Sequence, residues 1–469
     1  MNIKFSLILS IFMLLSFSSC LLKKEYQREN IQAPESFRAA VQLTGDTTLL
    51  PWRTFFKDPQ LVTLIERALN TNNEIAVAIK NMQQLELMYK QSKFALAPTA
   101  DLFLSANTTL PSGNSLDGTL SNQFIGSRYV QDYTAALQVN WEIDIWGKFK
   151  MQREAAQAEY FAQRENLIAL KTRIIVEVAQ AYYNLISLDE QLAIAEKYIS
   201  LSDSTLRIME LQFQAGETTA LALNQAKAQK KTAELLVPLA KQNIIIQENA
   251  LSILCGEFPR EIQHVSELQM AYPEEILATG VPVTLLSRRP DVRMAEYFAM
   301  ANFQRIGLAK ANLYPTISLS PQFGLNSYQL KNWLQIPGSF MQTLGGNVLV
   351  PIFQQKALRT AYKTATLEYE KSLIDFKQTF LVAVAEVSDA MALVQGAKER
   401  LVLAEEKSQY LEAAIADALK LYRSGMATYL DIIVAQNEKL LNDLDIINIK
   451  LEKMNATIQL YRALGGGIE

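Results

Sequence analysis

Residues that commonly carry out chemistry are scarce in this chain of 469 residues. It contains one histidine, His264, and two cysteines, Cys20 and Cys255. Metal sites and acid–base catalysts usually draw on several such side chains, so a metalloenzyme or a histidine-dependent hydrolase is disfavoured. Two cysteines also cannot build a disulfide framework. We interpret Cys255, in LSILCGEFP, as a small apolar residue near a helix end; the alternative is a reactive thiol.

No glycine-rich segment occurs in the context that phosphate binding requires, between a strand and a helix. GGNV at 345–348 falls within a predicted strand, and GGG at 465–467 lies at the end of the chain. No nucleophile elbow or metal-ligand spacing is found. Lys and Arg are spread along a chain of net charge -3, which disfavours nucleic-acid binding. The sequence therefore predicts that the protein is not an enzyme.

The motif LLSRRPDVRMAE contains Arg288, Arg289 and Asp291. Pro290 at a helix start with Asp291 in the first turn is typical of a helix N-terminus. We interpret these charged residues as structural, the alternative being contact with a bound molecule.

The N-terminus predicts export and a lipid anchor. Lys4 precedes the apolar run FSLILSIFMLLSF, and two serines then lead into Cys20. This arrangement is typical of a secretory signal peptide. A cysteine after small residues resembles a bacterial lipoprotein cleavage site, although Phe17 stands where leucine is usual. We expect a signal peptide at 1–19, a covalent lipid on Cys20 and no other cofactor. The alternative is an ordinary signal peptide cleaved elsewhere.

Two colinear sets of matches predict an internal duplication. With a shift of 217 residues the matched pairs include Lys93 and Lys310, Pro98 and Pro315, and Leu102 and Leu319. With a shift of 209 residues they include Glu196 and Glu405, Gly216 and Gly425, and Ala226 and Ala435. After a lipid-anchored segment at 20–56, we expect a first repeat at 57–271 and a second at 272–469. Each is predicted to contain a helix, two strands and two long helices, with a longer loop at 111–127 in the first.

The predicted strands alternate with a period of two. One face is apolar and is expected to face lipid; its members include Leu137, Val139, Ile317 and Leu319. The other face is polar and is expected to face a lumen; its members include Gln138, Asn140, Ser318 and Ser320. This pattern fits a transmembrane β-barrel, although a soluble sheet alternates in the same way. Export favours the barrel, because no apolar run after Cys20 reaches the length of a spanning helix.

The predicted helices are unusually long. No proline or glycine lies between Lys150 and Gln214, and only Gly396 interrupts the stretch from Lys356 to Ser424. Runs of this kind indicate coiled coil, with a heptad seam from Leu430 to Tyr461 and a local kink at Pro238. Gly216 and Gly425 each separate two such helices and predict tight antiparallel hairpins.

Several segments, in order, resemble the TolC/OprM family of outer-membrane efflux factors, of the NodT lipoprotein type. They are WRTFFKDPQLVTLIERALNTNNEI, VNWEIDIWGKFK, LLSRRPDVRMAE, IGLAKANLYPTISL, YRSGMATYLDIIVAQNEKL and YRALGGG. WGKFK and PIFQQKALR depart mildly from the usual forms. The resemblance covers about residues 50 to 467.

The resemblance implies a mixed α/β membrane protein: a homotrimer in which each subunit gives four strands to one shared barrel above a coiled-coil periplasmic tunnel. It implies the outer-membrane component of a tripartite efflux system, a passive exit duct for drugs and other small molecules. Its partners would be a periplasmic membrane-fusion adaptor and an inner-membrane pump. An alternative is a coiled-coil scaffold or adaptor lipoprotein without a pore.

Geometry places Gly216 and Gly425 at hairpin tips, which we expect to lie furthest from the barrel and to dock the adaptor. Asp417 lies about two helical turns before Gly425 and is a candidate for a narrow acidic ring at the periplasmic constriction. The alternative for Asp417 is a solvated carboxylate on the outer face.

Overall fold

The computed structural model describes residues 25–28, 32, 34–38, 50–273 and 282–467. These residues form two compact units. Among the described residues, the strand unit comprises 25–28, 83–161 and 297–374, and the helical unit comprises 32, 34–38, 50–82, 162–273, 282–296 and 375–467. Each unit draws on both halves of the chain, so the compact units do not coincide with the predicted repeats.

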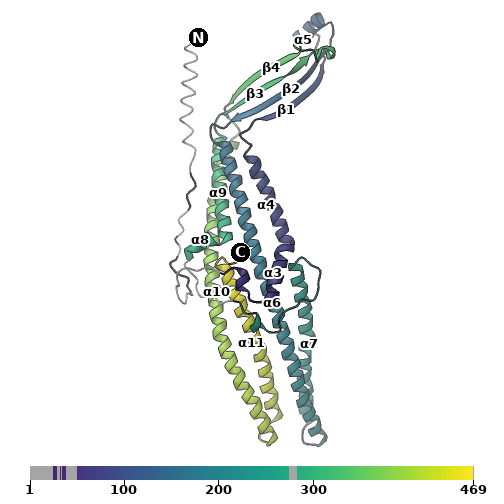
Figure 1. The fold of residues 1–469 in the computed structure, drawn as a ribbon, viewed down its shortest axis with the longest axis vertical. Coiled ribbons are helices and arrows are strands. Elements are labelled where there is room, and N and C mark those ends of the chain that lie inside the picture. The colour runs from purple at the N-terminus through teal and green to yellow at the C-terminus, as the bar shows by residue number, and fades with distance from the viewer. Residues whose placement is uncertain (1–24, 29–31, 33, 39–49, 274–281, 468–469) are drawn as a thin grey trace. The chain divides into compact units, whose positions relative to one another are not determined.

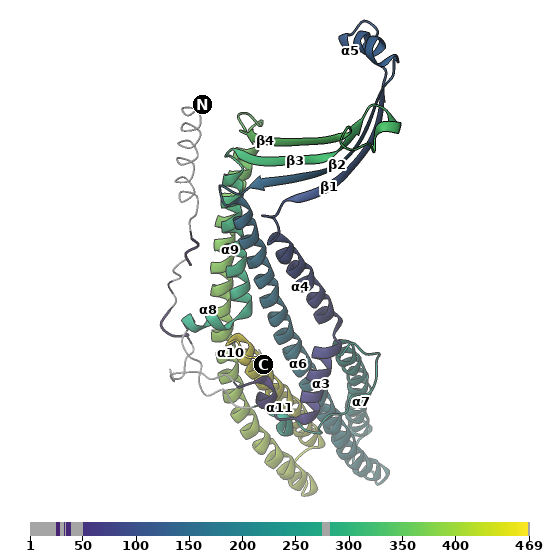
Figure 2. The same ribbon diagram turned by 45° about the horizontal axis from the view of Figure 1, so that its top comes forward.

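The strand unit contains one antiparallel sheet in the order β1-β2-β3-β4, which Figures 1 and 2 show as a curved ribbon. Its strands are β1 (Thr99–Thr109), β2 (Val130–Ile143), β3 (Thr316–Ser327) and β4 (Phe340–Leu349). The longer loop between β1 and β2 folds into α5 (Leu116–Leu120) and the π-helical turn η2 (Ser121–Ile125), and the 3-10 turn η5 (Leu330–Asn332) lies between β3 and β4.

Long helices make up most of the remaining chain. They form two consecutive pairs, α6 (Lys148–Gln214) with α7 (Ala220–Leu254) and α10 (Ala357–Arg423) with α11 (Tyr429–Ala463). Both first members have 67 residues and both second members have 35. Figure 1 shows each pair running out and back as a hairpin. Helix α7 continues through Pro238.

Shorter elements precede these pairs. Helices α2 (Trp52–Phe55), α3 (Pro59–Thr71) and α4 (Asn73–Ser92) come before β1, and α9 (Pro290–Ala311) comes before β3. Between α7 and α9 lie η3 (Leu268–Ala271), η4 (Pro282–Thr284) and α8 (Leu285–Arg288).

The start of α3 is fixed to α6 inside the core of the helical unit. Asp58 caps α3 by accepting a hydrogen bond from the Gln60 backbone at 2.8 Å. The same carboxylate accepts a hydrogen bond from the hydroxyl of Tyr182, which is fully buried. Burial first, and then Asp58, raise the pKa of Tyr182 well above its ordinary value. Tyr182 therefore remains a neutral donor and holds the capped helix against α6.

Within the described residues, α10 is long and apolar enough, by length and composition, to cross a membrane. Glu386 and Asp389 interrupt its apolar residues, so the prediction that no continuous apolar run reaches spanning length is unchanged. Phe380 and Val387 of this helix are buried in a core cluster.

One expectation about the long helices needs correction. The seam of α11 does not begin at Leu430, which is 53% exposed; near the hairpin the buried position is Ile432 instead. Near its start, α11 packs against the hairpin of α6 and α7, so the side of α11 that faces that hairpin is the buried side.

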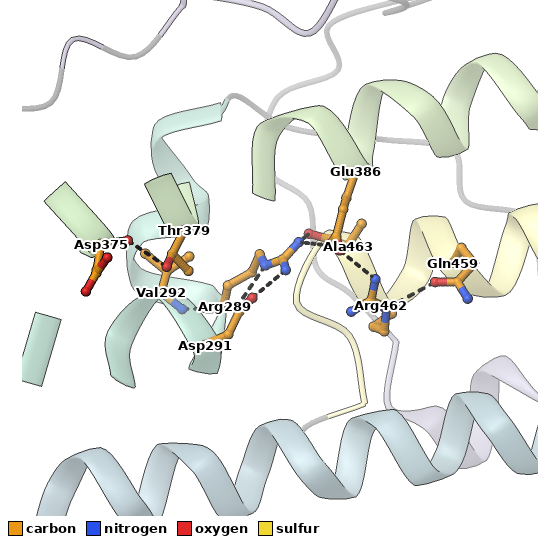
Figure 3. Close-up of polar contacts among 9 residues, drawn as sticks. All are labelled: Arg289, Asp291, Val292, Asp375, Thr379, Glu386, Gln459, Arg462 and Ala463. Atoms are coloured by element: carbon orange, nitrogen blue, oxygen red, sulfur yellow. Dashed lines mark hydrogen bonds and ion pairs between the residues drawn. The ribbon is translucent and has the colours of Figure 1, made fainter. Parts of the chain in front are cut away.

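A buried arginine joins the start of α9 to α10 and to the end of α11 (Figure 3). Helix α9 begins at Pro290 with Asp291 in its first turn, which confirms the predicted N-terminus. Arg289 is only 3% exposed and donates to Asp291 at 3.0 Å and to Glu386 at 2.6 Å. Arg462 also pairs with Glu386, at 3.0 Å. Burial alone would raise the pKa of Asp291, but its bonds with Arg289 outweigh that effect and lower it.

We expect Arg289→Met to lower the free energy of unfolding by about 3 kcal/mol, because it leaves the Asp291 carboxylate without its cation and Glu386 with Arg462 alone. The matched control is Arg305→Met in α9, the helix that Arg289 directly precedes. Arg305 is 53% exposed in its ion pair with Glu159, so its loss should cost less than about 1 kcal/mol. Chemical denaturation of the purified protein, followed by circular dichroism, gives both values.

The lowered pKa of Asp291 predicts a pH dependence. Its contribution to stability is present above its ordinary pKa of 3.8 and is lost as pH falls through the folded value. The difference in free energy of unfolding between the wild type and Arg289→Met should therefore become smaller in acid. If Arg289→Met and Arg305→Met lower the free energy of unfolding equally at neutral pH, the buried arginine has no special role in stability.

Candidate functional site

The sheet has one apolar and one polar face, because residues opposed in neighbouring strands point to the same side. One row of opposed residues runs from Asp101 through Gln138 and Gln322 to Thr343. The adjacent row contains Leu102, Leu137 and Phe323. Along the apolar face several side chains are exposed in the single chain: Leu102 72%, Leu104 63%, Leu137 46%, Leu344 83% and Val348 65%.

The predicted lipid-facing and lumen-facing residues separate cleanly between these faces. Alternation and register place Leu137, Val139, Ile317 and Leu319 together on the apolar face. The residues Gln138, Asn140, Ser318 and Ser320 share the polar face. The structure thus brings each predicted set together, and their contact with lipid or water stays a prediction.

Several apolar residues depart from this pattern. Phe103 in β1, Val130 in β2, and Met341 and Leu349 in β4 lie on the otherwise polar face. Phe103 and Leu349 are 47% and 69% exposed, and both belong to the outermost strands. Within the described ranges no strand pairs with the outer edge of β1 or of β4. Each edge therefore presents backbone donors and acceptors without a strand partner.

The two predicted hairpins have the same turn. Gly216 and Gly425 adopt positive φ values of 78° and 73°, a left-handed conformation that glycine reaches without strain. The backbone amides of Glu217 and Met426 close the helix ends by donating to Gln212 and Leu421 at 2.8 and 2.9 Å. A bulky side chain at either glycine would meet free space but a strained backbone.

The hairpins pack against one another close to their turns. Met209 and Ala226 of the first hairpin form a buried cluster with Tyr429 and Ile432 of the second. The hydroxyl of Tyr422 also donates to Gln212 at 2.5 Å. No local pattern indicates the contact between Tyr422 and Gln212, because the two residues are 210 positions apart and lie on different helices.

A second polar contact joins the hairpins further along α6. Tyr198 donates to Asp443 of α11 at 3.2 Å. Burial, and then the nearby Asp443 carboxylate, raise the pKa of Tyr198 well above its usual range, so it stays a donor. These contacts make the two hairpin tips of one subunit a single surface.

Asp417 lies on the exposed side of α10. Its side chain is 67% exposed and pairs with Lys420 of the same helix at 3.2 Å. An exposed pair of this kind is worth little energetically. Both interpretations of Asp417, a ring around a constriction and a solvated outer carboxylate, are compatible with this position in one subunit.

The structure describes one of the two cysteines. Cys255 is buried at the end of α7, as expected, and its pKa is raised by that burial, so the thiol is not activated. Cys20 lies outside the described residues. In the part of the chain that the structure describes, no group of three or more His, Cys, Asp or Glu side chains is arranged to hold a metal ion.

Comparison with known proteins assigns a family to this arrangement. The model of the outer membrane efflux protein family matches residues 64–257 and 281–466. The solvent efflux pump outer membrane protein SrpC of Pseudomonas putida is 29% identical over 468 residues, which cover 98% of both chains. The probable outer membrane lipoprotein SilC of Salmonella typhimurium is 28% identical over 472 residues, again 98% of each chain.

Solved structures show the same fold. A crystal structure of CusC superimposes with a TM-score of 0.85 at 25% identity, covering 95% of this chain and 99% of that one. The outer membrane protein VceC of Vibrio cholerae gives 0.79 at 26% identity, with coverage of 89% and 98%. The chain therefore belongs to the outer membrane efflux protein family, as an outer-membrane channel with a TolC-like fold.

Proposed function

We propose that this channel works as a homotrimer, in which three copies share one β-barrel and form a passive exit duct for drugs and other small molecules. The observation that carries the proposal is the sheet of four strands with an exposed apolar face and two edges without a strand partner in the described chain. Barrels need about eight strands or more to close. An open edge in lipid leaves backbone groups unsatisfied, at several kcal/mol each.

The apolar face then meets lipid and the polar face lines the duct. The polar face carries amide, hydroxyl and carboxylate groups, which suit a water-filled lumen. The relatives are named for solvents, toluene and cations. Such different cargoes within one family fit a wide conduit whose selectivity is set mainly by its partners.

Those partners are proposed to be a periplasmic membrane-fusion adaptor and an inner-membrane pump that supplies the energy. The paired hairpin turns at Gly216 and Gly425 offer a ring of helix ends when three copies assemble. A helical hairpin of an adaptor fits such a ring. The contacts of Tyr422 with Gln212 and of Tyr198 with Asp443 hold the two turns of each subunit together for docking.

The lipid anchor is predicted at Cys20. Mass spectrometry of the mature protein should show Cys20 as the N-terminal residue with acyl chains, since each buried CH₂ adds about 0.8 kcal/mol to membrane binding and several chains give stable anchoring. The control Cys20→Ser should yield no acylated form. A wild-type protein with an unmodified N-terminus beyond residue 20 refutes the anchor.

The two sheet faces should respond differently to charge. Arg at Leu137 or Leu319 should cost about 2–4 kcal/mol at mid-membrane depth, and Arg at Gln138 or Ser320 on the adjacent polar face much less. Cysteines at the same four positions should react with a membrane-impermeant thiol reagent only on the polar face. Equal labelling of both faces would falsify the assignment.

The hairpin turn should tolerate strain but not bulk. Gly425→Ala and Gly425→Leu both force a side chain into the left-handed conformation, at about 1–2 kcal/mol, but only leucine projects far enough to obstruct docking. We expect Gly425→Leu to abolish efflux in cells while the trimer still assembles, and Gly425→Ala to retain most of it. Normal drug export by Gly425→Leu removes the main support for docking at the tips.

Conductance in planar bilayers tests both the pore and the constriction. The wild-type protein should conduct in discrete steps, whereas a pore-less scaffold lipoprotein gives none. Asp417→Ala should raise the resting conductance or weaken cation selectivity, because a narrow ring of carboxylates favours cations. Lys420→Ala, which removes only the partner of Asp417, should retain cation selectivity. If Asp417→Ala changes neither property, Asp417 is outside the constriction.

A further inference from the structure

The turns between paired strands lie at the outer end of the sheet. Strands β2 and β4 lead directly into α6 and α10, so the β1–β2 and β3–β4 turns lie at the opposite end of the strands (Figure 1). The long helices form the periplasmic part of an outer-membrane channel. The two turns therefore lie at the extracellular rim, which is level with the outer leaflet of the membrane.

The β3–β4 turn, residues 328–340, presents large apolar side chains to its surroundings. Its exposed apolar residues are Tyr328 52%, Leu330 60%, Leu334 73%, Ile336 74% and Phe340 54%. Lys331 is the only charged residue of this stretch, YQLKNWLQIPGSF. Exposed apolar side chains gathered in one short turn indicate a surface that an apolar partner covers.

The turn folds onto the apolar face of the sheet. Trp333 packs against Tyr133 of β2, with ring centroids 6.4 Å apart. Tyr133 lies four residues before Leu137 in the same strand, so both side chains belong to the apolar face. Because β3 lies between β2 and β4, the turn reaches Tyr133 only by leaning across β3 on the apolar side. It therefore extends the surface that is proposed to contact lipid, and not the surface that lines the duct.

The backbone of the turn forms hydrogen bonds within the turn itself. Five of its amides donate to carbonyls of the same turn at 2.8 to 3.2 Å, those of Asn332, Trp333, Gln335, Ser339 and Phe340. The Ser339 hydroxyl also donates to the Asn332 carbonyl at 2.5 Å. Backbone groups enter lipid only when they have partners of this kind. The turn can therefore place its apolar side chains in lipid without leaving these amides unpaired.

We propose that the β3–β4 turn inserts into the outer leaflet and anchors the rim of the channel to lipid. Leu330, Leu334 and Ile336 then contact acyl chains. Trp333 and Tyr133 lie at the level of the lipid headgroups, where amphipathic rings concentrate. The Lys331 ammonium extends on its apolar stem to the lipid phosphates. The inference rests on the proposed lipid-facing assignment of the apolar face and adds a site of lipid contact beyond the strands.

Two observations favour lipid over a second copy of the chain as the partner of this turn. In a closed barrel, turns that meet across the mouth lean toward the polar, duct-lining face, whereas the contact between Trp333 and Tyr133 directs this turn to the other face. Copies of Lys331 also repel one another at a shared contact, while lipid phosphates attract them.

Site-directed spin labelling of the full-length protein in vesicles of phosphatidylethanolamine and phosphatidylglycerol tests the insertion. A nitroxide is attached to Leu334→Cys or to Ile336→Cys. Its collisions with oxygen, which concentrates in the bilayer, are compared with its collisions with a nickel chelate, which stays in water. Leu137→Cys and Gln138→Cys, on the two faces of β2, calibrate the values for lipid and for the duct. Cys255 is buried, and the wild-type protein taken through the same labelling gives the background.

We expect the ratio of oxygen to nickel collisions at both turn sites to match that at Leu137→Cys and to exceed that at Gln138→Cys several-fold. A ratio at either turn site equal to that at Gln138→Cys places the turn in water and overturns the inference. Strong dipolar broadening between the labels of one assembly at Leu334→Cys shows that the turns cover one another, which also overturns it. Equal ratios at Leu137→Cys and Gln138→Cys instead refute the lipid-facing assignment on which the inference rests.

Discussion

The hydrogen-bonding requirement of sheet edges in lipid is the constraint on which the rest of this structure depends. Water cannot satisfy a backbone amide or carbonyl in the hydrocarbon core, so a spanning sheet must close on itself. The described residues of one chain supply four strands, which is too few for closure. The exposed apolar face of the sheet also indicates that one subunit is incomplete, because Leu344 is 83% exposed in the single chain. The proposed homotrimer meets this requirement with strands and apolar cover from neighbouring copies.

The internal repeat is a natural response to this constraint. A ring built from repeated units needs one kind of junction at every position, and β2–β3 shows what that junction looks like. The paired helices follow the same plan, with 67 and 35 residues in each repeat. The two repeats differ at individual positions. Lys356 in a left-handed conformation, where the first repeat has Gly147, is such a place.

Much of this architecture was predictable from local pattern. Alternation identified the strands and separated Leu137 and Ile317 from Gln138 and Ser318, because a period of two leaves no other arrangement on a sheet. Pro290 with Asp291 marked the start of α9. The glycines at 216 and 425 marked the turns. In each case the physical cause lies within a few residues of sequence.

The contacts that were missed join distant parts of the chain. Arg289 was read as part of a helix terminus, but its ion pair with Glu386 spans 97 residues and crosses between helices. The pairing of Tyr422 with Gln212 is of the same kind. The seam near Leu430 was misplaced because the partner surface, rather than the heptad spacing, decides which face of α11 is buried. Sequence periodicity predicts that a helix has an apolar face, but it does not identify the element against which that face packs.

The central claim is that copies of this chain close one barrel through the edges of β1 and β4. A cryo-electron microscopy reconstruction of the protein in a lipid nanodisc measures this most directly. The account predicts a continuous barrel, with four strands from each of three copies and β4 of each subunit hydrogen-bonded to β1 of the next. Sheets with free edges, or a barrel closed by any other pair of strands, would contradict it.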